Sequence, residues 1–162
     1  MSGKCYLAAD LGASSGRVLA GLFKNGKLEL VELHRFWNGA VPQTDGLHWN
    51  IDQLFTEIKT GLKKGFEAYG SEVAAIGVDT WGVDYGLLDA QGRLLNHPFQ
   101  YRDSRTDGMM DKVFQTVPKE EVYRRTGLQF MQFNTIYQLS AERSRPEFKK
   151  AESFLFIPDL LN

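Results

Sequence analysis

The chain has little that would mark it for secretion, membrane insertion or disulfide formation. Its 162 residues include one cysteine, Cys5, which lies inside an apolar stretch and is expected to be a buried thiol with no internal partner. No apolar run reaches the ~18 residues of a membrane span. The N-terminal stretch is too short and too polar for a signal peptide. These absences predict a cytoplasmic protein.

An excess of charge of one sign is also lacking. The 19 Lys and Arg residues are nearly balanced by 20 Asp and Glu residues, and the net charge is -1. The chain therefore has no basic face for nucleic acid and no attraction to an anionic membrane. Its histidines, at positions 34, 48 and 97, show no metal-site spacing, and no Cys–His or Ser–His pattern supports covalent catalysis. These observations favour small-molecule partners.

The remaining pattern is that of an α/β domain of ordinary size. Strands are predicted at 5–10, 17–23 and 28–33, the last two joined by the Asn-Gly turn of a hairpin. A helix follows from about 51 to Gly70, with Asn50 as its N-cap and Gln53 at N3. Residues at spacings of three and four predict its buried stripe: Ile51, Leu54, Phe55, Ile58, Leu62 and Phe66.

The second half of the chain continues with short elements. It has predicted strands at 73–78 and 85–88, a surface loop at 97–105, and helices at about 107–116, 118–125 and 134–144. The last ten residues read as a strand turning into a helix that has barely begun. An apolar half-turn of this kind needs covering, which predicts that the chain is a fragment of a longer protein.

A turn of glycine and serine follows the first predicted strand. Asp10 ends that strand, and Gly12 and Gly16 let the backbone approach an anion closely. The turn also carries side chains for hydrogen bonding and positive charge: Ser14, Ser15 and Arg17. A carboxylate beside such a phosphate cradle makes chemical sense when a divalent cation lies between them. A hairpin turn that needs glycine and serine only for its shape is the alternative.

A second carboxylate, Asp79, ends the strand predicted at 73–78. Three antiparallel strands, a helix and a strand parallel to the first form the opening topology of the ribonuclease H-like or actin-like architecture. In this α/β layout, a central mixed sheet is flanked by helices, and Asp10 and Asp79 emerge at one sheet edge. Two carboxylates close together repel unless a cation bridges them. We therefore predict Mg²⁺ at Asp10 and Asp79.

Two later stretches offer groups suited to a sugar. Trp81 has a flat apolar face, and Asp84 supplies two acceptors for hydroxyl groups. The alternative is a core tryptophan and a turn aspartate. The stretch 101–105 is either a second wall of the same site or a solvated, salt-bridged loop. The segment 133–139 is consistent with an N-capped helix and nothing more.

Four stretches together resemble the N-terminal domain of the FGGY carbohydrate kinases. They are Asp-Leu-Gly-Ala-Ser-Ser-Gly-Arg at 10–17, Ile-Gly-Val-Asp-Thr-Trp-Gly-Val-Asp at 76–84, Tyr-Arg-Asp-Ser-Arg-Thr at 101–106 and Phe-Asn-Thr-Ile-Tyr-Gln-Leu at 133–139. They occur in the family's order and cover nearly the whole chain. The second and third stretches resemble the members of the family that act on L-rhamnulose.

The resemblance implies two actin-like domains around a cleft, with ATP and sugar between them, and transfer of the ATP γ-phosphoryl group to the 1-hydroxyl of L-rhamnulose. It implies that Asp10 helps to place Mg²⁺. The residues implied to line the ATP phosphates are Ala13, Ser14, Ser15, Gly16 and Arg17. The residues implied to meet the sugar are Gly82, Trp81 and Asp84, with Tyr101, Arg102, Asp103 and Arg105 as a further wall.

The chain departs from the family because the general-base aspartate and the adenosine-binding loops of these kinases lie in the C-terminal domain, beyond Asn162. Phosphoryl transfer needs groups from both sides of the cleft. We therefore expect residues 1–162, as most of the N-terminal domain, to bind ligands weakly and to show no turnover. The alternatives are a metal-dependent nuclease, a non-catalytic sugar- or nucleotide-binding module, and a fragment that dimerises through surface the missing half should cover.

Overall fold

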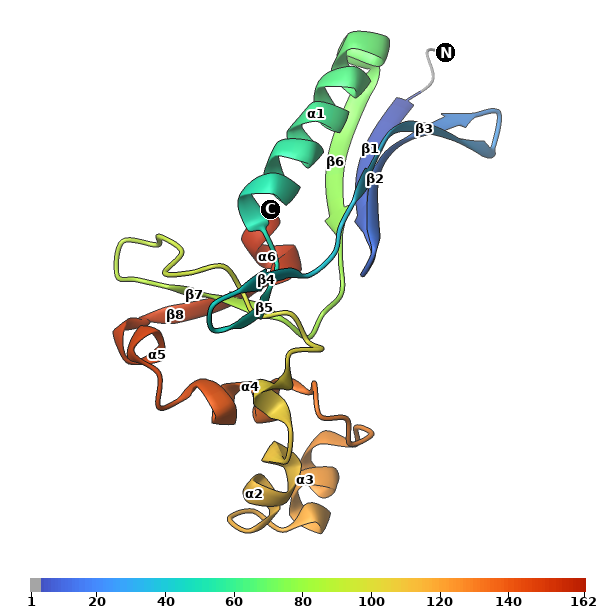
Figure 1. Ribbon diagram of the computed structural model, residues 1–162. Coiled ribbons are helices and arrows are strands. Elements are labelled where there is room, and N and C mark those ends of the chain that lie inside the picture. Colours follow the sequence, from blue (N-terminus) through green and yellow to red (C-terminus); the bar gives the residue numbers. More distant parts are fainter. Residues whose placement is uncertain (1–3) are drawn as a thin grey trace. The chain divides into compact units, whose positions relative to one another are not determined.

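The computed structural model describes residues 4–162, which form two compact units. The sheet unit comprises residues 4–40, 50–82 and 157–162. The helical unit comprises residues 41–49 and 83–156. Figure 1 shows the elements of each unit. Across the described residues, no helix is long and apolar enough to cross a membrane.

The sheet unit is built on four strands in the order β3-β2-β1-β6 (Figure 1). The first three pair antiparallel, and β6 pairs parallel with β1. Their bounds are Lys4–Leu11 for β1, Ser15–Lys24 for β2, Lys27–Trp37 for β3 and Val73–Asp79 for β6. The predicted antiparallel meander followed by a parallel strand is therefore confirmed.

Turn chemistry explains the β2–β3 hairpin. Asn25 and Gly26 have φ angles of 52° and 75°, the left-handed conformation that a type I′ turn needs at both central positions. Further along, the register of the β2–β3 pair shifts between Val18 and Leu19. The bulge brings Leu33 into the core beside Cys5, which is fully buried as predicted.

Helix α1 (Ile51–Tyr69) covers one face of the sheet and leads through the short 3₁₀ helix η1 (Gly70–Glu72) into β6. The Asn50 side chain accepts a hydrogen bond from the Gln53 amide at 3.1 Å, which confirms the predicted cap. The helix ends at Gly70, whose φ of 48° also agrees with the prediction. Helix α6 (Ile157–Leu161) contacts β6.

The buried stripe of α1 differs from the prediction. Phe55 and Phe66 are 47% and 48% exposed, so the prediction that they lie in the core is wrong. The helix instead approaches the sheet through Gly61, where an added Cβ would lie 2.3 Å from Val18. Glycine at this position lets helix and sheet pack closely. The predicted residues that are buried or pack at the core margin are Ile51, Leu54, Ile58 and Leu62.

The helical unit contains two small antiparallel sheets and four short α-helices. Strand β4 (Val41–Gln43) pairs with β5 (Gly46–His48), and β7 (Tyr85–Leu88) pairs with β8 (Ser153–Phe156). The helices are η2 (Ser104–Thr106, 3₁₀), α2 (Met109–Phe114), α3 (Lys119–Thr126), α4 (Thr135–Glu142) and α5 (Pro146–Lys150). The predicted helices at 107–116, 118–125 and 134–144 are thus confirmed: α2 and α4 are shorter than expected, and α3 is shifted by one residue.

The stretch 97–105 was predicted to be a surface loop. Residues 97–103 do form a loop, but the prediction that the stretch lies at the surface is wrong. Phe99, Gln100 and Asp103 are only 3%, 2% and 3% exposed. Phe99 forms an isolated bridge with His48, and the Gln100 amide donates to the Leu47 carbonyl at 2.9 Å. Backbone pairing with β5 satisfies the polar groups of this stretch, which allows it to be buried.

Candidate functional site

A row of charged side chains crosses the open face of the sheet, opposite α1, where β1 and β6 end. In the strand registers, Asp10 is paired with Arg17 on β2 and with Asp79 on β6. Arg17 is in turn paired with Arg35 on β3. Cross-strand partners project from the same face of a sheet, so four strands contribute one charge each to this row. The two carboxylates predicted to share a sheet edge do lie on neighbouring strands in register.

Asp10 and Arg17 form an ion pair. Nε of Arg17 donates to Oδ2 of Asp10 at 2.7 Å, and Nη2 approaches the same oxygen at 2.5 Å. Both side chains are more than a third exposed, so the pair contributes little to stability. Both contacts are made to Oδ2, so Oδ1 of Asp10 is available to another ligand.

The carboxylates of Asp10 and Asp79 fit a hard divalent cation as a partial ligand set. Asp79 is exposed at the end of β6, directly beside Asp10 in the register. Among residues 4–162, no group of three or more His, Cys, Asp or Glu side chains could enclose a metal ion. Mg²⁺ commonly binds through one or two protein carboxylates and completes its shell with water and phosphate oxygens. The donor set therefore suits an ion that arrives with a phosphate.

The glycine–serine turn between β1 and β2 is held by a residue that the sequence analysis missed. Nδ2 of Asn38 donates to the Gly12 carbonyl at 2.6 Å, and the Asn38 amide donates to the Ser14 carbonyl at 3.2 Å. Asn38 is 2% exposed. The Gly12 amide closes the turn on the Ser15 carbonyl at 2.9 Å. Asn38 therefore fixes the backbone of the turn from the end of β3.

The two glycines of this turn have different physical roles. Gly12 is exposed, and both its amide and its carbonyl are hydrogen-bonded within the turn, so it shapes the backbone there. Gly16 is buried, and a Cβ there would lie 2.4 Å from the Phe36 ring and 2.9 Å from Leu11. Close packing, which leaves no room for a side chain, is thus the reason for glycine at position 16.

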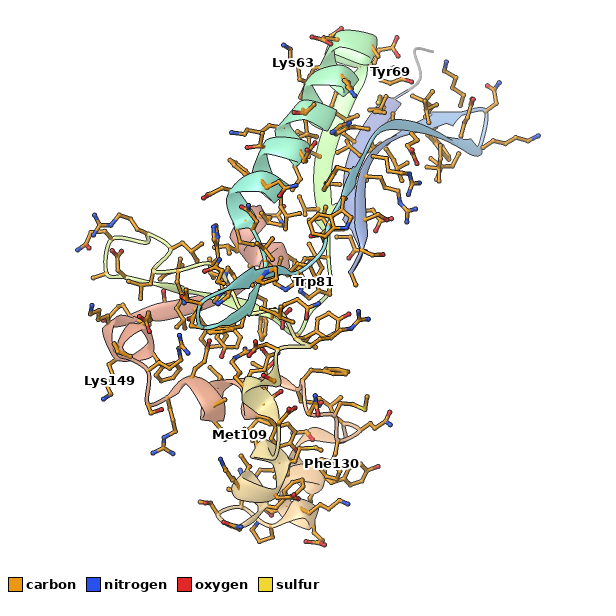
Figure 2. All side chains as sticks on the ribbon, in the orientation of Figure 1. Lys63, Tyr69, Trp81, Met109, Phe130 and Lys149 are labelled. Carbon is orange, nitrogen blue, oxygen red and sulfur yellow. The ribbon has the colours of Figure 1, made fainter. Side chains whose placement is uncertain are left out.

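The sheet unit also contains the first two residues predicted to meet a sugar. Trp81 and Gly82 follow directly after β6 and the residue Thr80. The Thr80 hydroxyl donates to the Trp81 carbonyl at 2.9 Å. Trp81 is half-buried and Gly82 is exposed, and Figure 2 labels the Trp81 side chain. The half-buried Trp81 ring and the exposed backbone of Gly82 thus follow the strand that ends in Asp79.

Asp84, in the helical unit, is a fully buried carboxylate that accepts hydrogen bonds through both of its oxygens. The Trp49 Nε1–H donates to Oδ2 at 2.6 Å, and the Tyr101 amide donates to the same oxygen at 3.1 Å. Nε2 of Gln138 donates to Oδ1 at 3.0 Å. Asp84 is 0% exposed. Several N–H donors compensate for the loss of water around a buried charge, so Asp84 ties together three segments of the chain.

Gln138 was part of the stretch at 133–139 that spacing alone describes as a plain helix. Its Nε2 also donates to the carbonyls of Val83 and Phe133 at 3.1 and 2.8 Å, and its Oε1 accepts from Nη2 of Arg105 at 2.5 Å. Gln138 is 0% exposed. A fully buried glutamine on a helix must have such partners, but no local pattern identifies them.

Arg105 lies in a buried polar cluster with Glu142 and Tyr85. Its Nε is 3.8 Å from Oε1 of Glu142, and the Tyr85 hydroxyl donates to Oε2 at 2.5 Å. Burial raises the pKa of the Glu142 carboxyl, although the hydrogen bond from Tyr85 and the charge of Arg105 oppose the rise. Burial and the neighbouring Glu142 carboxylate also raise the pKa of Tyr85.

The remaining predicted residues of the helical unit fall into two kinds. Asp103 is buried and accepts from the amides of Leu47 and Arg105 at 2.7 and 2.9 Å. Tyr101 is half-buried, and Arg102 is exposed and lies over the Tyr101 ring at 5.2 Å. Asp103 therefore organises the backbone, whereas Tyr101 and Arg102 retain surface that a ligand can reach.

The helical unit also has a groove of about 500 Å³ between α2 and α4. Its lining includes the apolar side chains of Val113 and Ile136 and the cations of Lys112 and Arg143. None of the residues predicted to bind ATP, sugar or metal lines this groove. The groove is therefore separate from the predicted site residues.

A family model places the chain among known proteins. The model described as "FGGY family of carbohydrate kinases, N-terminal domain" matches residues 5–162. The chain is 48% identical to a rhamnulokinase of Oceanobacillus iheyensis over 161 residues, covering 98% of this chain and 34% of that protein. It is 52% identical to a rhamnulokinase of Halalkalibacterium halodurans over 155 residues, covering 94% and 33%. The chain thus spans about a third of the length of these curated relatives.

Solved structures share the fold at low sequence identity. A gluconate kinase from Lactobacillus acidophilus superposes with a TM-score of 0.83 at 16% identity, covering 99% of this chain and 32% of that one. A xylulose kinase from Rhodospirillum rubrum superposes with a TM-score of 0.78 at 20% identity, covering 98% and 34%. At such identities the likeness shows the fold alone, and it confirms the predicted actin-like α/β class.

Proposed function

Because the chain belongs to the FGGY family of carbohydrate kinases, we propose that it is most of the N-terminal domain of an ATP-dependent sugar kinase. We infer that the complete kinase transfers the γ-phosphoryl group of ATP to the 1-hydroxyl of L-rhamnulose. The observation that carries this proposal is the in-register pair of Asp10 and Asp79 beside Arg17 and the glycine–serine turn. The identity of 48% and 52% to rhamnulokinases supports the choice of sugar.

The phosphate side of the proposed site belongs to the sheet unit. Asp10 and Asp79 would hold Mg²⁺, which supplies charge neutralisation for the phosphate oxygens when it is bound. The residues proposed to line the ATP phosphates are Ala13, Ser14, Ser15, Gly16 and Arg17. Asn38 would keep their backbone in place through its bonds to Gly12 and Ser14. Pre-positioned donors of this kind need not reorganise during the reaction.

Arg17 would have two states in this proposal. Without a cation nearby, its guanidinium pairs with Asp10 at 2.5 and 2.7 Å. A cation at Asp10 would weaken that pair by electrostatic competition, because both positive charges favour the same carboxylate. The guanidinium would then be available to a phosphate oxygen, which it can bind through two parallel N–H groups.

Each unit has its own candidate residues for sugar binding. Trp81 and Gly82 are the proposed contacts in the sheet unit, where an aromatic face suits the C–H groups of a sugar. Tyr101 and Arg102 are the proposed contacts in the helical unit because they keep accessible surface. The burial of Asp84, Asp103 and Arg105 favours positioning roles for them over direct sugar contact.

We expect the 162-residue chain alone to show no sugar kinase turnover. The general base and the adenosine-binding groups of the family belong to the part of the relatives that this chain does not span. Positioning from one side leaves the attacking hydroxyl without a proton acceptor. Binding of MgATP and sugar to the chain alone should also be weak.

A chimera gives the sharpest test. The N-terminal third of the Oceanobacillus iheyensis rhamnulokinase would be replaced by this chain, and ADP release would be measured with L-rhamnulose, D-xylulose and gluconate. We expect turnover with L-rhamnulose above the other two, loss of at least about 100-fold for Asp10→Asn and Asp79→Asn, and none for the isolated chain. A folded chimera inactive on all three sugars, or turnover by the isolated chain, would contradict the proposal.

A further inference from the structure

A lysine, a histidine and a glutamate form a linked series in the sheet unit, between β3 and α1. Nζ of Lys64 lies 3.1 Å from Nδ1 of His34. Nε2 of the same imidazole lies 2.6 Å from Oε2 of Glu57. The side chains of His34 and Glu57 are 17% and 30% exposed, and Lys64 is exposed at the surface of α1. None of the three belongs to the proposed kinase site.

The hydrogen bonds define which imidazole nitrogen carries the proton. A lysine side chain in its ammonium form can only donate, so Nδ1 of His34 is the acceptor. Nε2 then carries the proton, and this N–H donates a hydrogen bond to the Glu57 carboxylate. Glu57 thereby fixes the tautomer and the orientation of the ring, and it would stabilise an imidazolium if Nδ1 gained a proton. An amine, a base and an orienting carboxylate thus occur in the order that activates nucleophiles.

We propose that Lys64 is a site of acylation by small acyl donors with good leaving groups, namely acyl phosphates and thioesters. The lone pair of the Lys64 amine form attacks the acyl carbon, and the C=O bond electrons move to oxygen. In the resulting intermediate the nitrogen is positively charged, and His34 accepts its proton at Nδ1. Collapse of the intermediate restores the C=O bond, expels phosphate or thiolate, and leaves an amide on Nζ. The imidazolium then returns its proton to solvent.

The geometry assigns separate roles to the two partners of Lys64. His34 touches the reacting nitrogen and acts as general base, a contribution that reaches 10²–10⁴-fold in enzymes and is expected at about tenfold at this solvated site. Glu57 is hydrogen-bonded to His34 and acts on the reacting nitrogen through it, so it is a positioning residue. Lys64 is exposed, so a small acyl donor can reach its side chain.

The chain provides a matched internal control one residue away. Lys63 lies on the same helix (Figure 2), and its side chain is 78% exposed. Its charged neighbour is Glu67, at 3.9 Å, and a solvent-exposed carboxylate is a poor base for this step. Lys63 therefore reports the reactivity of an ordinary exposed lysine in the same molecule and the same solution.

The test treats the chain with acetyl phosphate, and separately with acetyl coenzyme A, and follows acetylation of each lysine by peptide mass spectrometry. We expect Lys64 to react about tenfold faster than Lys63 with both donors. The ratio should fall to about one in urea, where the cluster is unfolded. A ratio near one in the folded chain would overturn the proposal.

Two substitutions separate base catalysis from simple exposure. His34→Gln removes the base and should lower the Lys64 to Lys63 ratio to about one, with circular dichroism checking the fold. Glu57→Gln keeps a hydrogen-bond acceptor for the ring but removes its charge, so the ratio should fall only about threefold. The readout is the ratio of the two lysines within one molecule. Unfolding would also bring this ratio to about one, so the result for His34→Gln counts only when its circular dichroism spectrum matches that of the parent chain. An unchanged ratio in His34→Gln would refute the role of the imidazole.

Discussion

Replacement of Asp84 by asparagine tests whether this residue organises the helical unit. The carboxylate accepts from Trp49 and Tyr101 through Oδ2 and from Gln138 through Oδ1. Asparagine keeps only one oxygen, so its NH₂ group must face at least one donor. Gln138 cannot relieve this conflict by turning its amide, because its Oε1 is already the acceptor for Arg105.

The expected loss of stability follows from these contacts. A hydrogen bond to a charged group contributes about 1.5–3 kcal/mol, and one such bond is lost while the others weaken. We therefore expect Asp84→Asn to lower the free energy of unfolding by about 3 kcal/mol, or roughly 100-fold in the folding equilibrium. The Tyr101 amide should also exchange its hydrogen faster, because it donates to Asp84.

Urea unfolding followed by circular dichroism, together with amide exchange at Tyr101, measures both effects. Asp107→Asn is the matched control, because it makes the same chemical change at an exposed position of the same unit. The control should shift the free energy of unfolding by less than about 0.5 kcal/mol. Suppose instead that Asp84→Asn shifts the free energy of unfolding as little as the control does, and that the chimera with this substitution loses ADP release with L-rhamnulose. This result would refute the positioning role and favour direct contact with the sugar.

Three further outcomes are expected. Asn38→Ala should speed amide exchange in the glycine–serine turn about fivefold, because the Gly12 carbonyl loses a donor worth ~1 kcal/mol. Asn38→Asp should not restore protection, because a carboxylate cannot donate. Gly61→Ala should lower the urea midpoint, since overpacking against Val18 costs about 1–3 kcal/mol and outweighs ~1 kcal/mol of helix propensity. In a Val18→Gly background it should cost much less, because that change removes both the Cβ and the Cγ2 atom that the added Cβ would meet. Burial raises the pKa of Glu142 above 4.5, so the unfolded state releases its proton at a lower pH than the folded state. The free energy of unfolding should therefore fall as the pH rises from 4.5 through the folded-state pKa of Glu142. Glu142→Gln should flatten this decline, measured as urea midpoints over the same pH range.

Local structure was predictable where local chemistry determines it. The Asn25–Gly26 turn, the Asn50 cap and the end of α1 at Gly70 each depend on a few neighbouring residues. The parallel pairing of β6 with β1 followed from a helix between two apolar runs. The row of Asp10, Asp79 and their neighbours on one face is a direct consequence of that pairing.

Two features were not predictable from local chemistry: the close approach of α1 to the sheet at a glycine, and the burial of polar side chains. A count of apolar residues at helical spacing assigns Phe66 to the core and overlooks Gly61, because close approach depends on the side chain on the sheet. Asp84 finds its donors 35 and 54 residues away in Trp49 and Gln138. No periodic pattern carries information over such separations, whereas the tertiary fold brings these partners together.

The two outer strands of the four-stranded sheet differ in their tendency to pair with a further strand. β3 carries charges along its length, among them Lys27, Glu32 and Arg35, and has a bulge against β2. Among residues 4–162, β6 pairs with β1 as its one neighbouring strand, and from Val73 to Val78 it has neither a charge nor a proline. Charges and bulges discourage strand addition between molecules, and bare apolar edges invite it. Any further strand, from this polypeptide or another, would therefore add at β6, so growth of the sheet has a direction.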